Sequence, residues 1–255
     1  MPKQNPNSPQ SVFGKIAAIL DLFTVEQPIL TLAEITERTT ISKTTAFRLL
    51  QELTEFGYVS HHEKGYQLGM AAFRMGMVAK AQMRLDDVLT DLLQSLSQET
   101  GETIITAALD RDQIIYLHVI ESLNPLRFVA GAGARRALPF GATGMALLSQ
   151  LDIDIQKSLL NPPFPRFTDK TLTELSPYLA RLQQVKRDNL VVERGEYYDG
   201  IMAVAIPVAG KTPLTFTVVG PEKRILPIQS LIVDLLQSAA AEFGRMYIEI
   251  PMLNL

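Results

Sequence analysis

The segment TLAEITERTTISKTTAFRLLQELTEFGYVSHHEKGYQLG, residues 31–69, carries the pattern of two short helices and a two-stranded hairpin. Thr31 stands three residues before Glu34, the spacing of a capping box that begins a helix. Residues 39–42 supply a tight turn, and the Ser42 hydroxyl is placed to cap the helix that follows. The sequence therefore predicts two helices joined by a tight turn.

The second of these helices has two contrasting faces. Its apolar residues recur at the spacing of a single buried stripe: Ala46, Leu49, Leu50 and Leu53. Its other face gathers polar, basic and aromatic groups near the N-terminal end: Lys43, Thr44, Thr45, Phe47 and Arg48. A helix that presents such groups after a tight helical turn is typical of the helix-turn-helix unit that reads the major groove of DNA.

A hairpin should follow, because alternating residues at 58–60 and 66–68 flank the turn-forming Glu63-Lys64-Gly65. The two helices alone are equally compatible with a helical hairpin that packs in a core and touches no nucleic acid. A hairpin with Lys64 at its tip favours a DNA-binding wing.

Composition limits the class of protein. At 255 residues, with 47% hydrophobic residues, the chain has room for two domains and a substantial core. It contains no cysteine, no run of apolar residues long enough to span a bilayer, and no signal-peptide pattern at its polar N-terminus. Disulfides and thiolate metal sites are therefore excluded, and a cytoplasmic location is expected.

The charge is divided unevenly along the chain. The formal net charge is −3, made up of +2 over residues 1–85 and −5 over residues 86–255. A slightly basic head on an acidic body suits a DNA-binding domain attached to a domain of another function. We expect a disordered N-terminus at 1–10, a winged helix-turn-helix domain at 11–69, a linker helix at 70–85 and an α+β domain at 86–255.

The second half switches between helical and strand patterns. Helices are predicted at 86–100, 142–150, 152–160 and 172–188, the last with a capping box of Thr171 and Glu174, and from 227 to about 245. Strands are predicted at 103–109, 113–120, 126–130, 200–208 and 214–219. In the first half, a helix over residues 12–23 is predicted, with Val12, Ile16, Ile19, Leu20 and Phe23 on one face. A sheet bracketed by helices is α+β.

No catalytic or metal-binding motif is visible in the sequence, so no cofactor, metal or catalytic residue is predicted. His61 and His62 fall in the hairpin, and His118 lies in an apolar strand, where a structural role is more usual than a role as general base. Small-residue turns at 140–144, at Gly200 and at 219–221 suit either simple chain reversal or close approach of a small ligand.

Several short stretches, taken in order, resemble the IclR family of bacterial transcriptional regulators. They are Leu32-Ala-Glu-Ile35, Lys43–Leu50, Gly57-Tyr58, Gly65-Tyr-Gln-Leu-Gly69, Leu138-Pro139, Ala142–Leu148, Gly200–Val208 and Val218–Pro221. The resemblance covers nearly the whole chain. It implies a winged helix-turn-helix that binds operator DNA as a dimer or dimer of dimers, and a GAF-like domain that binds a small-molecule effector, often an organic acid or aromatic compound.

Carried over position by position, the resemblance implies an effector pocket lined by Leu138, Ala142, Thr143, Glu193, Ala203, Thr217 and Val219. Thr143 and Thr217 would supply hydroxyls, and N–H groups near Ala142 would meet a carboxylate. The chain departs from the family pattern in a shorter segment at 139–144. It also has Glu193, Ala203 and Val219 at positions where the family often has Asp, a Cys or small polar residue, and Ser. These changes make the pocket more apolar, and a pocket without a ligand is one alternative.

For the DNA-binding head, Lys43, Thr44, Thr45, Phe47 and Arg48 are expected to enter the major groove. Ser42, His61 and Lys64 are expected to contact phosphates. The function predicted is a ligand-responsive transcriptional regulator. Two alternatives stay open: a regulator whose second domain only oligomerises, and a small-molecule enzyme fused to a DNA-binding head.

Overall fold

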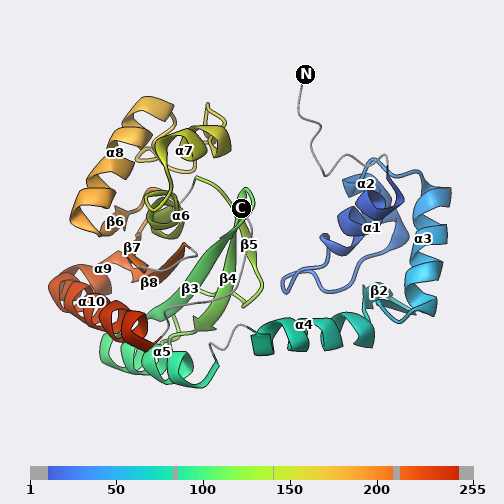
Figure 1. Ribbon diagram of the computed structural model, residues 1–255, viewed down its shortest axis with the longest axis horizontal. Coiled ribbons are helices and arrows are strands. Elements are labelled where there is room, and N and C mark those ends of the chain that lie inside the picture. The colour runs from blue at the N-terminus through green and yellow to red at the C-terminus, as the bar shows by residue number, and fades with distance from the viewer. Residues whose placement is uncertain (1–10, 83–85, 140, 209–212, 247–255) are drawn as a thin grey trace. The chain divides into compact units, whose positions relative to one another are not determined.

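The chain folds into two compact units, residues 1–82 and 83–255. The computed structural model describes residues 11–82, 86–139, 141–208 and 213–246 (Figure 1). The expected disordered N-terminus at 1–10 and the last residues of the expected linker helix, 83–85, lie outside the described residues.

The first unit is the winged helix-turn-helix that the sequence predicts. Its elements are α1 (Val12–Leu20), α2 (Leu32–Arg38), α3 (Lys43–Glu55), β1 (Val59–His62), β2 (Gly65–Leu68) and α4 (Met70–Gln82). The capping box is confirmed: the Glu34 N–H donates to the Thr31 hydroxyl, and the Thr31 N–H donates to Glu34 Oε2 at 2.8 Å. The Ser42 hydroxyl accepts from the Thr45 N–H and so caps α3.

The core of this unit is built from the predicted stripe of α3 and from apolar residues of α1, α2 and the hairpin. Ile19, Ile35 and Leu50 are fully buried at its centre. Val12 was expected on the buried face of α1, but it is 58% exposed, because this first helical residue lies beyond the reach of the core. Phe23 packs against the core from beyond the end of the helix.

Helix α4 makes little contact with the rest of its own unit. Of its described side chains, only Ala71 is buried. Large apolar side chains are exposed along its length: Met70, Phe73, Met75, Met77 and Val78. An isolated helix of 13 residues is marginally stable in water. Packing against the first unit therefore stabilises only the N-terminal end of this helix.

The second unit is the predicted α+β domain, consistent with a GAF-like fold. Among its described residues, six strands form one antiparallel sheet in the order β5-β4-β3-β8-β7-β6. They are β3 (Thr103–Asp110), β4 (Gln113–Ile120), β5 (Arg135–Ala137), β6 (Val191–Arg194), β7 (Ile201–Val208) and β8 (Leu214–Pro221). The helices are α5 (Asp86–Thr100), α6 (Gly141–Leu148), α7 (Ile153–Leu159), α8 (Leu175–Asp188), α9 (Glu222–Ile225) and α10 (Gln229–Met246), with a 3₁₀ turn at Leu226–Ile228.

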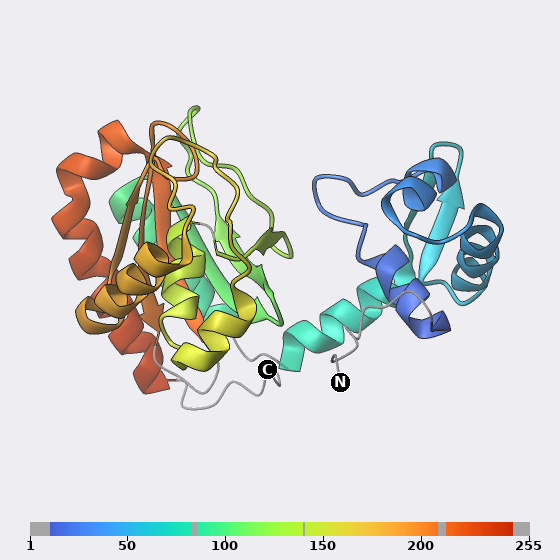
Figure 2. The same ribbon diagram turned by 90° about the horizontal axis from the view of Figure 1, so that it is seen from above.

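The sheet has a hydrophobic core on each face, with helices on both sides (Figures 1 and 2). On one face, α5 and α10 pack against alternate residues of β3, β7 and β8, including Ile104, Val204 and Phe216. On the other face, α6 and α8 pack against residues that include Ala107 and Ala205. The central strands are buried on both faces, which explains their almost continuous apolar sequence.

The sequence predictions for this unit were wrong about one strand, missed two others and misplaced the start of one helix. Residues 126–130 form no strand, because their carbonyls are bonded to side chains instead: the Arg224 guanidinium donates to Leu126 O and the Thr103 hydroxyl donates to Phe128 O. The edge strand lies later, at β5. The sequence reading also gave no strand at β6.

The start of α8 was also predicted wrongly. The helix begins at Leu175 rather than 172, and Glu174 is its N-cap without a side-chain bond. Thr171 does not form the expected capping box, because its hydroxyl accepts from the N–H groups of Phe167 and Thr168 and donates to Glu196 O. The Thr171 hydroxyl, which the local sequence pattern assigned to a helix cap, is therefore used in tertiary hydrogen bonds instead.

No helix among the described residues is long and apolar enough to cross a membrane.

Replacing Gly65 by Ala should destabilise the first unit. A Cβ at this position would lie 2.6 Å from the Leu30 carbonyl oxygen, and the backbone has φ +133°, which favours glycine. We expect a loss of about 1–3 kcal/mol in the free energy of unfolding, measured by urea denaturation. Gly76→Ala on α4 is the control: its Cβ meets nothing within 4 Å. That change should be neutral or slightly stabilising, and equal effects of the two changes would contradict the packing argument.

Candidate nucleic-acid interface and effector pocket

The residues predicted to contact DNA lie on α3, at its N-cap and in the hairpin. Lys43, Thr44, Phe47 and Arg48 are exposed, while Ala46 and Leu49 on the other face of the helix are buried. Arg48 also lies 3.9 Å from Glu52, with both side chains more than half exposed, a pair that contributes little stability. The exposed side of α3 is thus available to a partner, as a recognition helix requires.

The same exposed stripe continues one turn further than the sequence analysis proposed. Gln51 follows Thr44 by seven residues and Phe47 by four, so it falls on their side of the helix, and it is exposed. The helical spacing of Thr44, Phe47 and Gln51 was the signal that would have found it. A glutamine side chain can bond to adenine in the major groove.

The hairpin holds the other two predicted contacts. The His61 ring lies against Tyr66, with ring centroids 4.5 Å apart. Lys64 is exposed in the turn, and its N–H donates to His62 Nδ1 at 3.3 Å. Of the two predicted phosphate contacts in the hairpin, His61 thus packs on a neighbouring ring and Lys64 is exposed at the turn.

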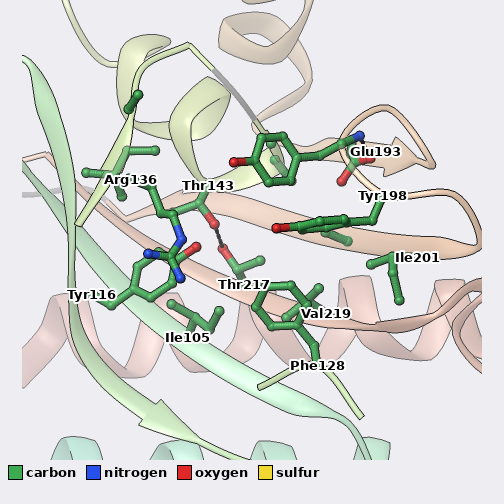
Figure 3. Close-up of a pocket in the computed structure, with 16 residues that line it drawn as sticks. Ile105, Tyr116, Phe128, Arg136, Thr143, Glu193, Tyr198, Ile201, Thr217 and Val219 are labelled. Atoms are coloured by element: carbon green, nitrogen blue, oxygen red, sulfur yellow. Dashed lines mark hydrogen bonds between the residues drawn. The ribbon is translucent and has the colours of Figure 1, made fainter. Parts of the chain in front are cut away.

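A hollow opens in the second unit on the sheet face that α6 covers (Figure 3). The space that it outlines is about 560 Å³, part of which is open solvent. Sixteen described residues line it: Ile105, Ile114, Tyr116, Phe128, Arg136, Ala137, Gly141, Ala142, Thr143, Glu193, Tyr197, Tyr198, Ile201, Ala203, Thr217 and Val219.

Six of the seven pocket residues implied by the sequence meet in this hollow: Ala142, Thr143, Glu193, Ala203, Thr217 and Val219. The register of the sheet brings three of them together, since Ala203 is paired with Val219, two residues from Thr217 on the same strand. Leu138 is not among the lining residues. It packs against the hydrophobic core, near Gly144 of α6.

Thr143 and Thr217 meet at the centre of the hollow. Their hydroxyl oxygens are 3.1 Å apart and share a hydrogen bond between α6 and β8 (Figure 3). Both residues are buried. Each hydroxyl can donate one hydrogen bond and accept others, so the pair can also bond to a ligand.

The position of α6 is fixed from outside the hollow. The Tyr178 hydroxyl of α8 donates to the carbonyl oxygen of Pro139, two residues before the helix begins. Burial raises the pKa of Tyr178 well above its ordinary value, so the hydroxyl stays protonated and remains a donor. This bond holds the chain where it enters α6, whose first turn lines the hollow.

Glu193 is a buried carboxyl at the wall of the hollow. Its Oε1 accepts from the N–H groups of Glu196 at 2.6 Å and Tyr197 at 3.2 Å, which fixes the turn after β6. Burial raises its pKa, and the nearby Glu196 carboxylate adds to this, while the two N–H bonds and Arg181 oppose it.

The sequence analysis missed the aromatic and cationic part of the lining. Tyr116, Phe128, Tyr197 and Tyr198 come from three separate segments, and Arg136 comes from the short strand β5. Alternation along β4 was the available signal for Tyr116, but no local pattern marked the loop residues. Among the described residues, no group of three or more His, Cys, Asp or Glu is placed to hold a metal ion.

The two units together define a class of protein: a DNA-binding helix-turn-helix joined to a domain with a small-molecule pocket. Comparison with known proteins specifies the family. Residues 14–63 match the IclR helix-turn-helix domain, and residues 77–243 match the family described as bacterial transcriptional regulator IclR C-terminal. The chain belongs to the IclR family of transcriptional regulators.

Individual relatives agree with this assignment. The chain is 32% identical over 208 residues to the HTH-type transcriptional regulator KdgR of Escherichia coli K12, covering 80% of this chain and 78% of KdgR. It shares the fold of a putative IclR regulator from Silicibacter sp. TM1040, with TM-score 0.83 and 23% identity over 92% of this chain and 96% of that one. An IclR homologue from Microbacterium hydrocarbonoxydans, in complex with 4-hydroxybenzoate, gives TM-score 0.77 and 20% identity over 91% and 96% of the two chains.

The pH dependence of stability should report the burial of Glu193. Because its pKa is raised in the native state, the native state holds the proton more tightly than the unfolded state does. The stabilisation of the native state that this raised pKa gives is complete below the ordinary pKa of 4.5. It is lost as the pH rises through the pKa of Glu193 in the native state.

Glu193→Gln removes this titration and keeps an oxygen for the two N–H groups. The melting temperature of the variant, relative to that of the unchanged protein, should therefore rise as the pH is raised from 4.5 toward 8. Glu99→Gln, at an exposed position on α5, is the control and should show no such trend. A constant difference between Glu193→Gln and the unchanged protein across this range would contradict the assignment.

Proposed function

We propose that this regulator binds operator DNA through α3 and the hairpin, and that a small metabolite bound in the hollow of the second unit changes its affinity for DNA. The observation that carries the proposal is the hollow itself, with six of the inferred effector residues on its wall. A ligand shifts the regulator between states only by binding one state more tightly than the other. The site of action we propose is the cytoplasm, where operator DNA is found.

In the proposed DNA complex, Thr44, Thr45 and Arg48 read base edges, and Phe47 contacts a thymine methyl group. Lys43 enters the groove with them. Ser42, His61 and Lys64 contact phosphates and set the register of the protein on the duplex. Exposure of Lys43, Phe47 and Arg48 on one helix supports this arrangement.

We propose that the effector is a compact organic acid or an apolar or aromatic metabolite. The apolar and aromatic lining supports a ligand with a hydrophobic body, and the relative from Microbacterium hydrocarbonoxydans binds 4-hydroxybenzoate. We also propose that the ligand is bound rather than transformed. The sixteen described residues that line the hollow include no histidine, cysteine or serine, and the two threonine hydroxyls are bonded to each other.

We further propose that the operator-bound form is a dimer that pairs through α4, with association of two dimers as a further step. The exposed apolar side chains of α4 support this, since a helix so little packed within its own unit gains stability from a partner. A two-fold dimer also suits the paired half-sites that helix-turn-helix proteins read.

Arg48→Ala should reduce discrimination between operator and unrelated DNA. Loss of a base contact by an arginine costs about 1–3 kcal/mol in selectivity. The operator is first obtained by selecting bound fragments from genomic DNA, and affinities are then measured by gel shift at fixed salt. Arg187→Ala, at an exposed position near the end of α8, is the control and should have no effect. An unchanged operator preference for Arg48→Ala would refute its role in base recognition.

Replacing Phe73 and Met77 together by serine should weaken the dimer. These side chains are 61% and 51% exposed and lie one turn apart on the same side of α4. Sedimentation equilibrium should show a monomer–dimer equilibrium displaced toward monomer. Ala79→Ser, on the opposite side of the helix, is the control and should leave the equilibrium unchanged. Dimers of equal strength in all three proteins would exclude α4 from the interface.

A further inference from the structure

The two charged residues on the wall of the hollow lie at opposite ends of it. Figure 3 shows Arg136 at one end and Glu193 at the other, with Thr143, Thr217 and Tyr198 between them. Arg136 is the single cationic side chain among the sixteen described residues that line the hollow, and Glu193 is the single acidic one. The pocket therefore has a positive pole and an acidic pole.

Sheet register directs Arg136 into the hollow. Arg136 is paired with Ile114, and cross-strand partners point to the same face of a sheet; both residues line the hollow. The neighbouring Arg135 points to the other face, where it lies 3.5 Å from Asp110. Two consecutive arginines thus have different roles, which provides a matched control.

The Arg136 guanidinium is held in place near the ring of Tyr116. Its central carbon lies 5.5 Å from the Tyr116 ring centroid, and Nη1 donates to the Arg135 carbonyl oxygen at 2.8 Å. Figure 3 places it beside Thr143, in the first turn of α6. The N–H groups of a first helical turn carry partial positive charge, so this end of the hollow favours an anion from two directions. The planar guanidinium matches a carboxylate in shape.

The acidic pole disfavours a second anion. One oxygen of Glu193 already holds the N–H groups of Glu196 and Tyr197, and the whole residue is 5% exposed. A ligand carboxylate at this end would meet a like charge in a site with little water, and such contacts are costly. A neutral group would not.

Apart from the hydroxyl pair of Thr143 and Thr217, the space between the poles is lined mainly by apolar groups and aromatic rings. Ile105 and Val219 come from the sheet, and Phe128 and Tyr198 face them with ring centroids 6.3 Å apart. Alanine at 203 and valine at 219 offer no side-chain hydrogen bond. The middle of the hollow therefore selects a hydrophobic body.

From these observations we propose that Arg136 is the residue that recognises the effector's anionic group and that Glu193 excludes a second one. The effector is then a monocarboxylate with a ring-sized apolar body and an uncharged far end. This inference rests on the proposed function, because it assigns the chemistry of the same pocket. It places the anion-recognising charge on Arg136 of β5, a residue that is not among the seven pocket positions implied by the family resemblance.

Titration calorimetry on the full chain tests the assignment with three probes built on one benzene ring: benzoate, benzamide and terephthalate. The unchanged protein should bind benzoate at least about tenfold more tightly than either of the other two, since loss of a charged hydrogen-bonded pair or gain of a like charge costs at least that factor. Arg136→Gln should bind benzoate no better than benzamide. Arg136→Lys should restore part of the preference, and Arg135→Gln should keep all of it.

Glu193→Gln is expected to gain binding of one probe, whereas Arg136→Gln is expected to lose binding of another. Without the buried carboxyl, terephthalate binding should improve by about tenfold or more, while benzoate binding changes little. The improvement is a gain of binding, which a damaged fold does not produce. Melting curves of every variant accompany the titrations.

The assignment is overturned if benzoate does not bind, if Arg136→Gln retains the preference for benzoate over benzamide, or if Glu193→Gln still rejects terephthalate. Equal losses in Arg135→Gln and Arg136→Gln would also overturn it. Gel shifts on the same preparations separate this failure from that of the proposed function. Operator binding that responds to a metabolite of another chemistry would leave the regulator assignment intact. Absence of any ligand response would refute both.

Discussion

The pocket depends on one constraint, the alternation of side chains along the paired strands β3, β7 and β8. Ile105, Thr217 and Ala205 are neighbours across these strands, so they face the same side of the sheet. The intervening residues Ile104, Val218 and Val204 face the other side, where α5 and α10 pack. A slip of one residue in any of these strands would exchange the pocket wall for the core. The threonines can stand on the wall because one sheet face is reserved for the hollow and the other for packing.

Small side chains form the floor of the pocket, and large side chains form its sides. Ala203 and Val219 of the sheet and Ala142 of α6 present short apolar side chains to the hollow. The volume is bounded instead by aromatic groups on loops, which are packed on one another: Tyr197 contacts Phe167 and Tyr198 with centroids 4.5 and 4.7 Å apart. The pocket is thus bounded by short side chains of the sheet and of α6 and by aromatic side chains of the loops.

The sequence predicted the fold well wherever local patterns control structure. The capping box of Thr31, the stripe of α3 and the alternation of β3 and β4 are short-range signals, and the structure confirms the element that each of them predicted. The errors came where tertiary contacts override local preference, as with the Thr171 hydroxyl, which bonds to residues 25 positions away instead of capping a helix. Most of the implied pocket positions gathered at the hollow, because they lie on regular strands and on α6. Arg136 and the tyrosines escaped notice because their positions depend on which loops and edges fold over the sheet.

The same alternation gives a physical path by which a ligand could change the rest of the chain. Ile105 lines the hollow, while its neighbour Ile104 packs with Leu89, Leu93 and Leu96 of α5 on the opposite face. Adjacent residues of one strand cannot move independently, since densely packed interiors transmit displacement rather than absorb it. A ligand that shifts β3 therefore shifts the contacts of α5, and α5 begins only three residues after α4 ends. Only a ligand with different affinities for the two arrangements can drive such a shift. In the proposed mechanism, the contacts at Arg136 and Glu193 would supply that difference, which a molecule that fills the apolar middle alone has fewer ways to do.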